Sequence, residues 1–213
     1  MSRAFRLGIT GKIGSGKSTL SDIARSHGIR VLDADTIAKE VMSANPEVRE
    51  KIQSIFGEKA YSDGVLNRSF LASKIFTDDS LRIKLEEIVH PVTLQVFEEE
   101  FHKAKQGEII GLESAILFQT GLDEIFDAVI LVDAKDENVI SREAASGKFS
   151  REDITNRLEQ QNYQNEWIED ADFVIANNGS KEDFTKSCEA VIELALIISK
   201  GDLPDEPLRM LNE

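Results

Sequence analysis

The feature that most constrains the fold of this chain is a glycine-rich run near its N-terminus. Residues 11–18 read Gly-Lys-Ile-Gly-Ser-Gly-Lys-Ser and fit the pattern G-x-x-x-x-G-K-[ST] of phosphate-binding loops. The apolar residues 5–10 before the run can form a short buried strand, and the residues after it place Leu20, Ile23 and Ala24 on one helical face. A chance match in a turn rich in glycine and serine is the alternative, but the strand before and the helix after favour a nucleotide phosphate site.

The chemistry of phosphate binding explains this spacing. Glycines allow the backbone to curl so that successive N–H groups point into one concavity, and the following helix adds the positive end of its dipole. Lys17 can reach the β- and γ-phosphates as a point charge, and the hydroxyl of Ser18 is placed to ligate Mg²⁺. We therefore predict phosphate contacts from six consecutive residues: Gly14, Ser15, Gly16, Lys17, Ser18 and Thr19.

The composition limits the function classes that remain. A net charge of −14 over 213 residues repels a polyanion, so nucleic acid is not an expected partner. The single cysteine, Cys188, lies in a helical pattern, which excludes a disulfide framework and fits a reducing compartment. No apolar run approaches the length of a membrane span and no signal peptide precedes the first strand, so we expect a cytoplasmic protein.

Apolar runs that alternate with helical patterns predict an α/β fold with a five-stranded, mostly parallel sheet. The predicted strands are residues 5–10, 30–33, 108–113, 127–133 and 171–176. Residues 34–107 show helical patterns without a strand, so we expect a helical insert in a core made of residues 1–33 and 108–200. Within the insert, His90-Pro91 is expected to end one helix and begin another, because proline disfavours helix at the preceding residue. Residues 201–213, with two prolines, are interpreted as a loosely held tail.

Three acids stand at or just after predicted strand ends, where ligands of parallel sheets bind: Asp33, Asp35 and Glu113. A phosphoryl transferase needs a carboxylate that orients or deprotonates the attacking hydroxyl, and Mg²⁺ needs oxygen ligands, directly or through water. Asp33 is equally well explained as a helix N-cap, which leaves Asp35 as the better candidate for chemistry. Glu113 resembles the Walker-B position, and the alternative for it is a solvent-exposed strand end.

Cations gather in one segment of this acidic chain, in the helices predicted at 138–145 and 151–161 and in the link between them. They are Arg142, Lys148, Arg151 and Arg157. Such residues meet the charge that develops on a transferring phosphoryl group, often from a mobile lid. We favour this role for Arg142 and surface ion pairs for Lys148 and Arg151. His90 stands alone, and its alternatives are substrate binding and a hydrogen bond to the backbone at the helix break.

Taken together, these segments resemble the dephospho-coenzyme A kinase family, with a likeness that runs from residue 8 to residue 179. Besides the phosphate loop, the likeness rests on five further segments. They are Asp33-Ala34-Asp35, Asp63-Gly64-Val65-Leu66-Asn67-Arg68, the segment from Arg82 to His90-Pro91, Arg157-Leu158-Glu159-Gln160-Gln161 and Ala171-Asp172-Phe173-Val174-Ile175. The loop alone is generic, whereas Asp-Ala-Asp with a downstream His-Pro and a late Arg-x-x-x-Gln is specific.

The resemblance implies a three-layer fold like that of P-loop nucleoside-monophosphate kinases, with a helical acceptor-binding insert and a lid at residues 142–160. It implies transfer of the γ-phosphoryl group of ATP to the ribose 3′-hydroxyl of dephospho-coenzyme A, the last step of coenzyme A synthesis, with Mg²⁺ as cofactor. The expected partners are ATP and dephospho-coenzyme A, and the protein is expected to be a monomer or a small homo-oligomer.

The resemblance also assigns roles to particular residues. Asp35 holds the position of the catalytic acid, with Lys17 and Arg142 as catalytic cations, and Asn177 lies near the adenine of ATP. The acceptor-binding residues are Asp33, Arg82 and His90, and the metal-binding residues are Ser18 and Glu113, the latter directly or through water.

The sequence departs from the family pattern at three places. Lys12 stands where the family usually has glycine, which puts a further cation beside the phosphates or in solvent. The acid that begins Glu113-Ser114-Ala115-Ile116-Leu117-Phe118-Gln119 is usually an aspartate, so it is longer here by one methylene. The second of two lid arginines is Ser146 here, for which Lys148 is a candidate substitute.

Two other functions remain open at the level of the sequence. The first is a kinase of the same architecture that acts on a nucleoside monophosphate or another small alcohol. The second is a nucleotide-dependent switch that binds partner proteins. A GTPase switch would need an Asn-Lys-x-Asp guanine signature, and Asn177-Asn178-Gly179-Ser180 supplies neither the lysine nor the aspartate.

Overall fold

The computed structural model of the chain describes residues 3–147, 150–161 and 164–201. The chain divides into two compact units, one made of residues 1–32 and 103–213 and the other of residues 33–102. We call them the sheet unit and the helical unit. The expected tail, residues 201–213, lies outside the described residues except for Gly201.

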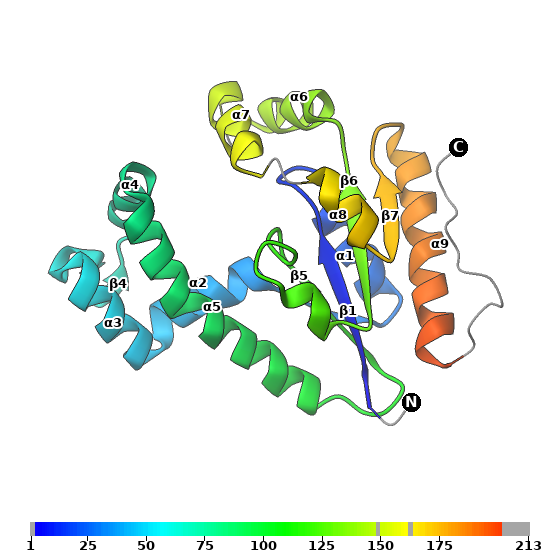
Figure 1. Ribbon diagram of the computed structural model, residues 1–213, viewed down its shortest axis with the longest axis horizontal. Coiled ribbons are helices and arrows are strands. Elements are labelled where there is room, and N and C mark those ends of the chain that lie inside the picture. The colour runs from blue at the N-terminus through cyan, green and yellow to red at the C-terminus, as the bar shows by residue number, and fades with distance from the viewer. Residues whose placement is uncertain (1–2, 148–149, 162–163, 202–213) are drawn as a thin grey trace. The chain divides into compact units, whose positions relative to one another are not determined.

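The centre of the sheet unit is a five-stranded sheet in the order β2-β5-β1-β6-β7 (Figure 1). Its strands are β1 (Phe5–Thr10), β2 (Arg30–Asp33), β5 (Ile109–Glu113), β6 (Ala128–Asp133) and β7 (Phe173–Ala176). The pairs β1–β5, β1–β6 and β6–β7 are parallel. The predicted α/β fold is therefore confirmed, with three of the strands beginning one or two residues later than predicted.

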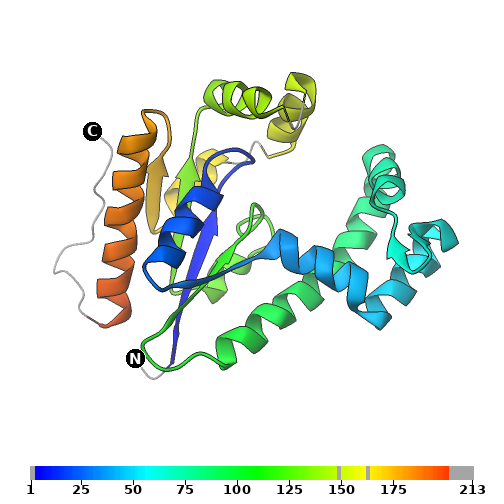
Figure 2. The same cartoon turned by 180° about the vertical axis from the view of Figure 1, so that it is seen from behind.

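Helices cover both faces of this sheet because its central strands are apolar on both sides. Two of them, α1 (Lys17–Ser26) and α9 (Lys181–Ser199), pack against each other on one face. Figure 2 shows α1 in front of the sheet, whereas Figure 1 shows α8 (Gln164–Asp170) and the short helix η2 (Leu122–Ile125) in front of the other face. The core between the sheet and the helices α1 and α9 includes fully buried side chains from strands and helices, among them Leu7, Ile9, Leu20, Ile130, Cys188 and Ile192.

Two further helices of the sheet unit follow β6 and have a small core of their own. They are α6 (Asp136–Ser146) and α7 (Arg151–Gln160). Val139, Ile154 and Leu158 of these helices form one buried cluster with Ala134, which precedes α6, and Ile13 of the phosphate loop packs against it. A capping box begins α7, because the Ser150 hydroxyl accepts from the Asp153 N–H and the Asp153 carboxylate accepts from the Ser150 N–H.

The helical unit holds four α-helices and a hairpin in the stretch that the structure describes from residue 33 to 102. Its elements are α2 (Ala34–Ala44), α3 (Pro46–Phe56), η1 (Glu58–Ala60), β3 (Tyr61–Ser62), β4 (Val65–Leu66), α4 (Arg68–Thr77) and α5 (Asp79–His102). The expectation of an insert without strands is wrong, since β3 and β4 pair in antiparallel fashion. Asp63 and Gly64 join them with φ of 49° and 79°, the backbone geometry of a tight hairpin turn.

The expected helix break at His90-Pro91 is also wrong, because α5 continues through both residues. Proline at this position removes the N–H that would bond the carbonyl of Glu87, a loss of about 3 kcal/mol in a helix interior. Burial on one side of the helix offsets this loss: Val89, Phe97 and Phe101 are buried, and α5 packs against α2, α3 and α4. Tertiary packing therefore overrides the local preference of the proline.

Candidate active site

The phosphate loop of the sheet unit joins the end of β1 to the start of α1. Gly14 and Gly16 have φ of 66° and 114°, in the left-handed region that other residues rarely adopt. The N–H of Ser15 donates to the carbonyl of Lys12 at 3.2 Å, and the N–H groups of Thr19 and Leu20 donate to the carbonyl of Gly16. The loop is thus curled before the N-terminus of α1, in the geometry that binds a phosphate.

The ammonium group of Lys17 lies inside this curl. Its Nζ donates to the carbonyl oxygens of Gly11 and Lys12 at 2.8 and 2.9 Å. The side chain therefore returns over its own loop, and its charge is held where the loop concentrates N–H donors. A phosphoryl group bound by the loop would meet this charge directly.

Ser18 and Glu113 meet beside the loop. The hydroxyl of Ser18 donates to Oε1 of Glu113 at 3.0 Å. Glu113 is the last residue of β5, pairs in register with Ile9 of β1 and is only 8% exposed. The alternative of a solvent-exposed strand end is therefore wrong for Glu113.

This pair fits the chemistry of a magnesium ion. A hydroxyl and a carboxylate oxygen are hard ligands, and Mg²⁺ typically takes one or two protein oxygens together with water and substrate phosphates. Within the part of the chain that the structure describes, no group of three or more His, Cys, Asp or Glu residues could hold a metal ion by itself. The hydroxyl and the carboxylate thus fit an ion that also takes oxygen ligands from water and from substrate phosphates.

Asn177 and Arg142 connect the loop to the lid segment. The Nδ2 group of Asn177 donates to the carbonyl of Ser15 at 2.7 Å, and its backbone N–H donates to the carbonyl of Asp133 at 2.7 Å. The Nη2 group of Arg142, on α6, donates to the carbonyl of Asn177. Asn177 is 7% exposed. This one buried residue therefore contacts the phosphate loop through its side chain and Arg142 through its backbone carbonyl.

The side chain of Lys12 is buried, so the expectation that its cation could lie in solvent is wrong. It is 10% exposed, and its Nζ lies 3.0 Å from Oδ1 of Asp136, the first residue of α6. The next residue along, Ile13, donates its N–H to Oε1 of Gln161 at 2.8 Å. Neither partner could be found from the sequence, because both contacts depend on how α6 and α7 fold back over the loop.

In the helical unit, Asp33 is the N-cap of α2, as one of its two interpretations predicts. Its Oδ1 accepts from the N–H of Asp35 at 3.0 Å, and its Oδ2 accepts from the hydroxyl of Thr36 at 2.7 Å. Asp35 is exposed in the first turn of α2. Its carboxylate is therefore accessible, whereas that of Asp33 is already engaged.

The other two predicted acceptor-binding residues lie on α5, which packs against α2. Arg82 forms exposed ion pairs with Glu86 at 2.9 Å and Asp79 at 3.3 Å, and the hydrogen bond with Glu86 raises the pKa of the guanidinium. His90 is half-buried in the middle of the helix rather than at a break. In the lid segment, Ser146 ends α6, and Lys148 lies outside the described residues.

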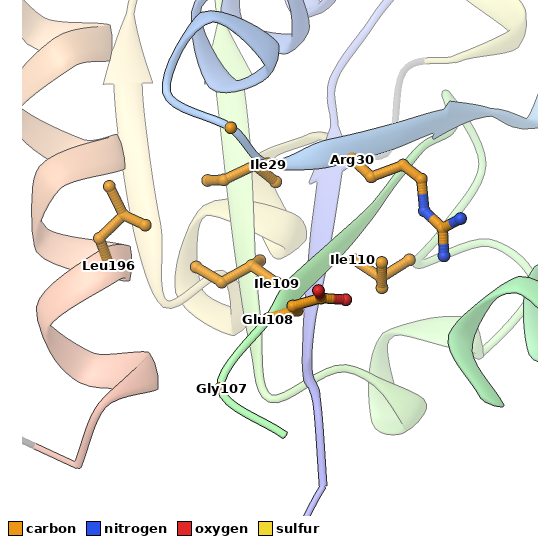
Figure 3. A pocket seen from close by; sticks show the side chains of 8 residues that line it. Ile29, Arg30, Gly107, Glu108, Ile109, Ile110 and Leu196 are labelled. Carbon is orange, nitrogen blue, oxygen red and sulfur yellow. The ribbon is translucent and has the colours of Figure 1, made fainter. Parts of the chain in front are cut away.

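A separate pocket of about 440 Å³ lies in the sheet unit where β2 and β5 begin (Figure 3). Its walls are mainly aliphatic, with one acid and one cation, and are formed by Gly28, Ile29, Arg30, Gly107, Glu108, Ile109, Ile110 and Leu196. The phosphate loop follows the opposite, carboxyl end of β1, where ligands of parallel sheets bind. This pocket therefore does not belong to the phosphate site.

A curled phosphate loop, a strand-end carboxylate on its serine and a parallel sheet with covering helices define a P-loop nucleotide-binding protein. The family model described as dephospho-CoA kinase matches residues 5–183 of the chain. Among curated relatives of that name, the protein of Bacteroides fragilis (strain YCH46) is 34% identical over 178 residues, 84% of this chain and 87% of the relative. That of Corynebacterium glutamicum is 34% identical over 194 residues, 88% and 98% of the two chains.

Solved structures agree with these relatives. A crystal structure of a Thermus thermophilus protein matches with a TM-score of 0.77 and 33% identity, and the match covers 90% of this chain and 98% of that one. The dephospho-CoA kinase from Campylobacter jejuni matches with a TM-score of 0.68 and 30% identity over 93% of this chain and 98% of its own. The chain belongs to the dephospho-CoA kinase family, which confirms the resemblance seen in the sequence.

None of the helices in the described ranges is long and apolar enough to cross a membrane.

Proposed function

We propose that this chain transfers the γ-phosphoryl group of ATP to the ribose 3′-hydroxyl of dephospho-coenzyme A and releases ADP and coenzyme A. The observation that carries the nucleotide half of this proposal is the contact between Ser18 and Glu113 beside the curled phosphate loop. The acceptor is supported by membership of the dephospho-CoA kinase family over both units of the chain.

In the proposed reaction the 3′-oxygen of the acceptor forms a bond to the γ-phosphorus while the bond to the bridging oxygen of ADP breaks. The proton of the hydroxyl passes to the carboxylate of Asp35, which is exposed at the start of α2. Lys17 neutralises charge on the γ-phosphoryl oxygens as the bond to ADP lengthens. Arg142 adds a second cation from the lid, and Gly14, Ser15, Gly16, Ser18 and Thr19 hold the phosphates.

Ser18 and Glu113 are the residues that would hold Mg²⁺, Ser18 directly and Glu113 directly or through water. When bound, the ion would reduce the negative charge that opposes attack by the hydroxyl. Asn177 is proposed to lie near the adenine, because the family pattern has its corresponding residue there.

For the acceptor we propose contacts with Asp33, Arg82 and His90 of the helical unit, residues 33–102. Arg82 would exchange its exposed ion pairs for an anionic group of dephospho-coenzyme A, a replacement that costs little because such pairs contribute about 0–1 kcal/mol. Asp33 would keep its capping bonds to α2 and use the remaining lone pairs of its carboxylate. The single, buried cysteine supports assignment to the cytoplasm.

The test is a coupled assay of ADP release with ATP, Mg²⁺ and a panel of acceptors: dephospho-coenzyme A, AMP, CMP, pantetheine and coenzyme A. We expect turnover with the first alone. Coenzyme A is the matched control, because its 3′-hydroxyl already carries the phosphate. Comparable turnover of AMP or CMP would contradict the acceptor assignment, and ATP binding without turnover of any acceptor would contradict a kinase function.

A further inference from the structure

The phosphate loop contacts helices α6 and α7 through three consecutive residues, Lys12, Ile13 and Gly14. Lys12 forms the ion pair with Asp136, and Ile13 packs against the core of α6 and α7. Gly14 is so close to α6 that a Cβ there would lie 2.8 Å from atoms of Val139 and of Glu143. These are three of the four variable positions of the loop pattern, so the sequence motif does not prescribe their side chains.

Lys12 differs from an ordinary surface lysine in two respects. Only 10% of its side chain is exposed, so its charge needs a partner, and Asp136 at 3.0 Å supplies it. Asp136 itself stands in the first turn of α6, where the helix dipole favours a carboxylate. The carbonyl of Lys12 also accepts from Nζ of Lys17 and from the N–H of Ser15. One residue therefore links the start of α6 to the internal bonds of the phosphate loop.

The contacts form a closed circuit. From Asp136, helix α6 runs six residues, about 9 Å along its axis, to Arg142. Arg142 donates to the carbonyl of Asn177, the amide of Asn177 donates to the carbonyl of Ser15, and the N–H of Ser15 donates back to the carbonyl of Lys12. The ion pair thus fixes the start of α6 on the phosphate loop, and Arg142, further along the helix, is linked to the same loop through Asn177.

We infer that Lys12 is a positioning residue that, through Asp136, holds α6 on the phosphate loop and so sets where Arg142 lies relative to the bound triphosphate. This inference rests on the proposed function for the role of Arg142. A glycine at this position would leave α6 held by Ile13 and Gln161 without an ion pair. The ammonium group of Lys12 pairs with Asp136 of α6 and not with a phosphate. Loss of either partner should therefore lower kcat and leave the KM for ATP nearly unchanged.

The kinetic experiment compares Lys12→Met, Asp136→Asn and their combination with the wild type. Each single variant should lower kcat by about 3- to 30-fold, with a much smaller change in the KM for ATP, and the double variant should lose little more than the worse single. Asp136→Glu, which keeps the charge, should retain kcat. Arg3→Met is the matched control, because Arg3 and Asp127 form an ion pair over the same sequence separation at the other end of β1 and β6.

A second measurement needs no acceptor. Amide hydrogen exchange of residues 137–145 should become faster by about 3- to 30-fold in Lys12→Met and in Asp136→Asn but not in Arg3→Met, with exchange in α9 unchanged. If dephospho-coenzyme A is not phosphorylated at all, the proposed function fails, and this measurement still decides whether Lys12 holds α6.

Three results would overturn the inference. Opposite changes in the KM for ATP, higher in Lys12→Met and lower in Asp136→Asn, would show that Lys12 binds the triphosphate once it is released. Losses in kcat that multiply in the double variant would show that the two residues act independently. Unchanged exchange in α6 would show that the ion pair does not hold the helix.

Discussion

The hydroxyl of Ser18 and the carboxylate of Glu113 lie 3.0 Å apart, although 95 positions separate them in the chain. Their contact follows from the register of the sheet, which places Ile9 of β1 beside Glu113 at the end of β5. Ser18 then returns over that end of the sheet because the phosphate loop turns directly into α1. The register of the sheet and the turn of the loop in this way bring a hydroxyl and a buried carboxylate together.

Glu113→Gln removes the charge of this pair and keeps its shape, so it tests the proposed metal site. We expect the Mg²⁺ concentration that gives half-maximal rate to rise by about 10- to 100-fold, the usual effect of losing such a partner. Ser18→Ala should raise this concentration in the same way. In the double variant the rise should be smaller than the product of the two single rises, because both residues are proposed to hold one ion. Titration of the initial rate with Mg²⁺ at saturating ATP measures this. An unchanged Mg²⁺ requirement in Glu113→Gln would contradict the assignment.

Lys17→Ala should lower kcat by about 10²- to 10³-fold, because the ammonium follows the transferring phosphoryl group into the transition state. The structure adds an effect on stability, since Lys17 donates two hydrogen bonds to loop carbonyls. Their loss should lower the free energy of unfolding by about 1 kcal/mol, as measured by urea denaturation. Activity close to that of the wild type would show that this lysine is only a structural part of the loop.

Asp35→Asn should lower kcat by about 10²- to 10⁴-fold with little change in the KM for ATP, because in the proposed reaction this acid acts on the acceptor hydroxyl. Asp33→Ala is the companion variant. It removes the cap of α2 and should lower the free energy of unfolding by about 1 kcal/mol. Steady-state kinetics and denaturation of both variants separate the two roles. A dominant loss of ATP affinity in Asp35→Asn would place this residue among the metal ligands instead.

Gly14→Ala and Gly121→Ala separate the strain of a backbone angle from contact with the lid. The two glycines have φ of 66° and 65°, so both substitutions should lose about 1–2 kcal/mol from the left-handed conformation. At Gly121 nothing lies within 4 Å of the added Cβ, whereas at Gly14 the Cβ would meet Val139 and Glu143. Thermal unfolding should therefore show a larger loss for Gly14→Ala, together with a lower kcat. Equal losses would contradict the close approach of α6.

The thiol of Cys188 should not react with a thiol reagent at pH 8 until the protein unfolds. Burial raises its pKa to about 12, so the reactive thiolate is almost absent in the folded protein. The folded thiol keeps its proton while the unfolded one loses it above a pKa of about 8.5. The free energy of unfolding should therefore fall as the pH rises from about 8.5 towards 12, and this part of the fall should be absent in Cys188→Ala. Rapid labelling of the native protein would contradict the burial.

The sequence predicts the strands and the loop because both have strong local signals. The apolar runs that become β1 and β6 are buried on both faces, and the glycines of the loop adopt the angles that their spacing predicts. Where tertiary contacts decide, local reasoning fails. Pro91 remains inside α5 because Val89 and Phe97 bury the helix on either side of it.

The partners of the site residues were likewise beyond a single sequence. Asp136 and Gln161 meet the loop only once α6 and α7 have folded over it, and no periodicity or spacing indicates this. Glu113 is the exception, since its place at a strand end points to the serine of the loop. The pattern of the strands thus predicts this one contact, and the lid contacts require the fold itself.

Residues 33–102 are a single unbroken stretch between β2 and β5, strands that are neighbours in the sheet. A link of about a dozen residues is enough to join two neighbouring parallel strands, so most of residues 33–102 is not needed to connect β2 to β5. The stretch can therefore be inherited as one piece: transplanted between kinases, it would carry the acceptor contacts and the base, Asp35, that we propose for it. The recipient would keep its ATP machinery, and a new alcohol would become a substrate through one recombination event.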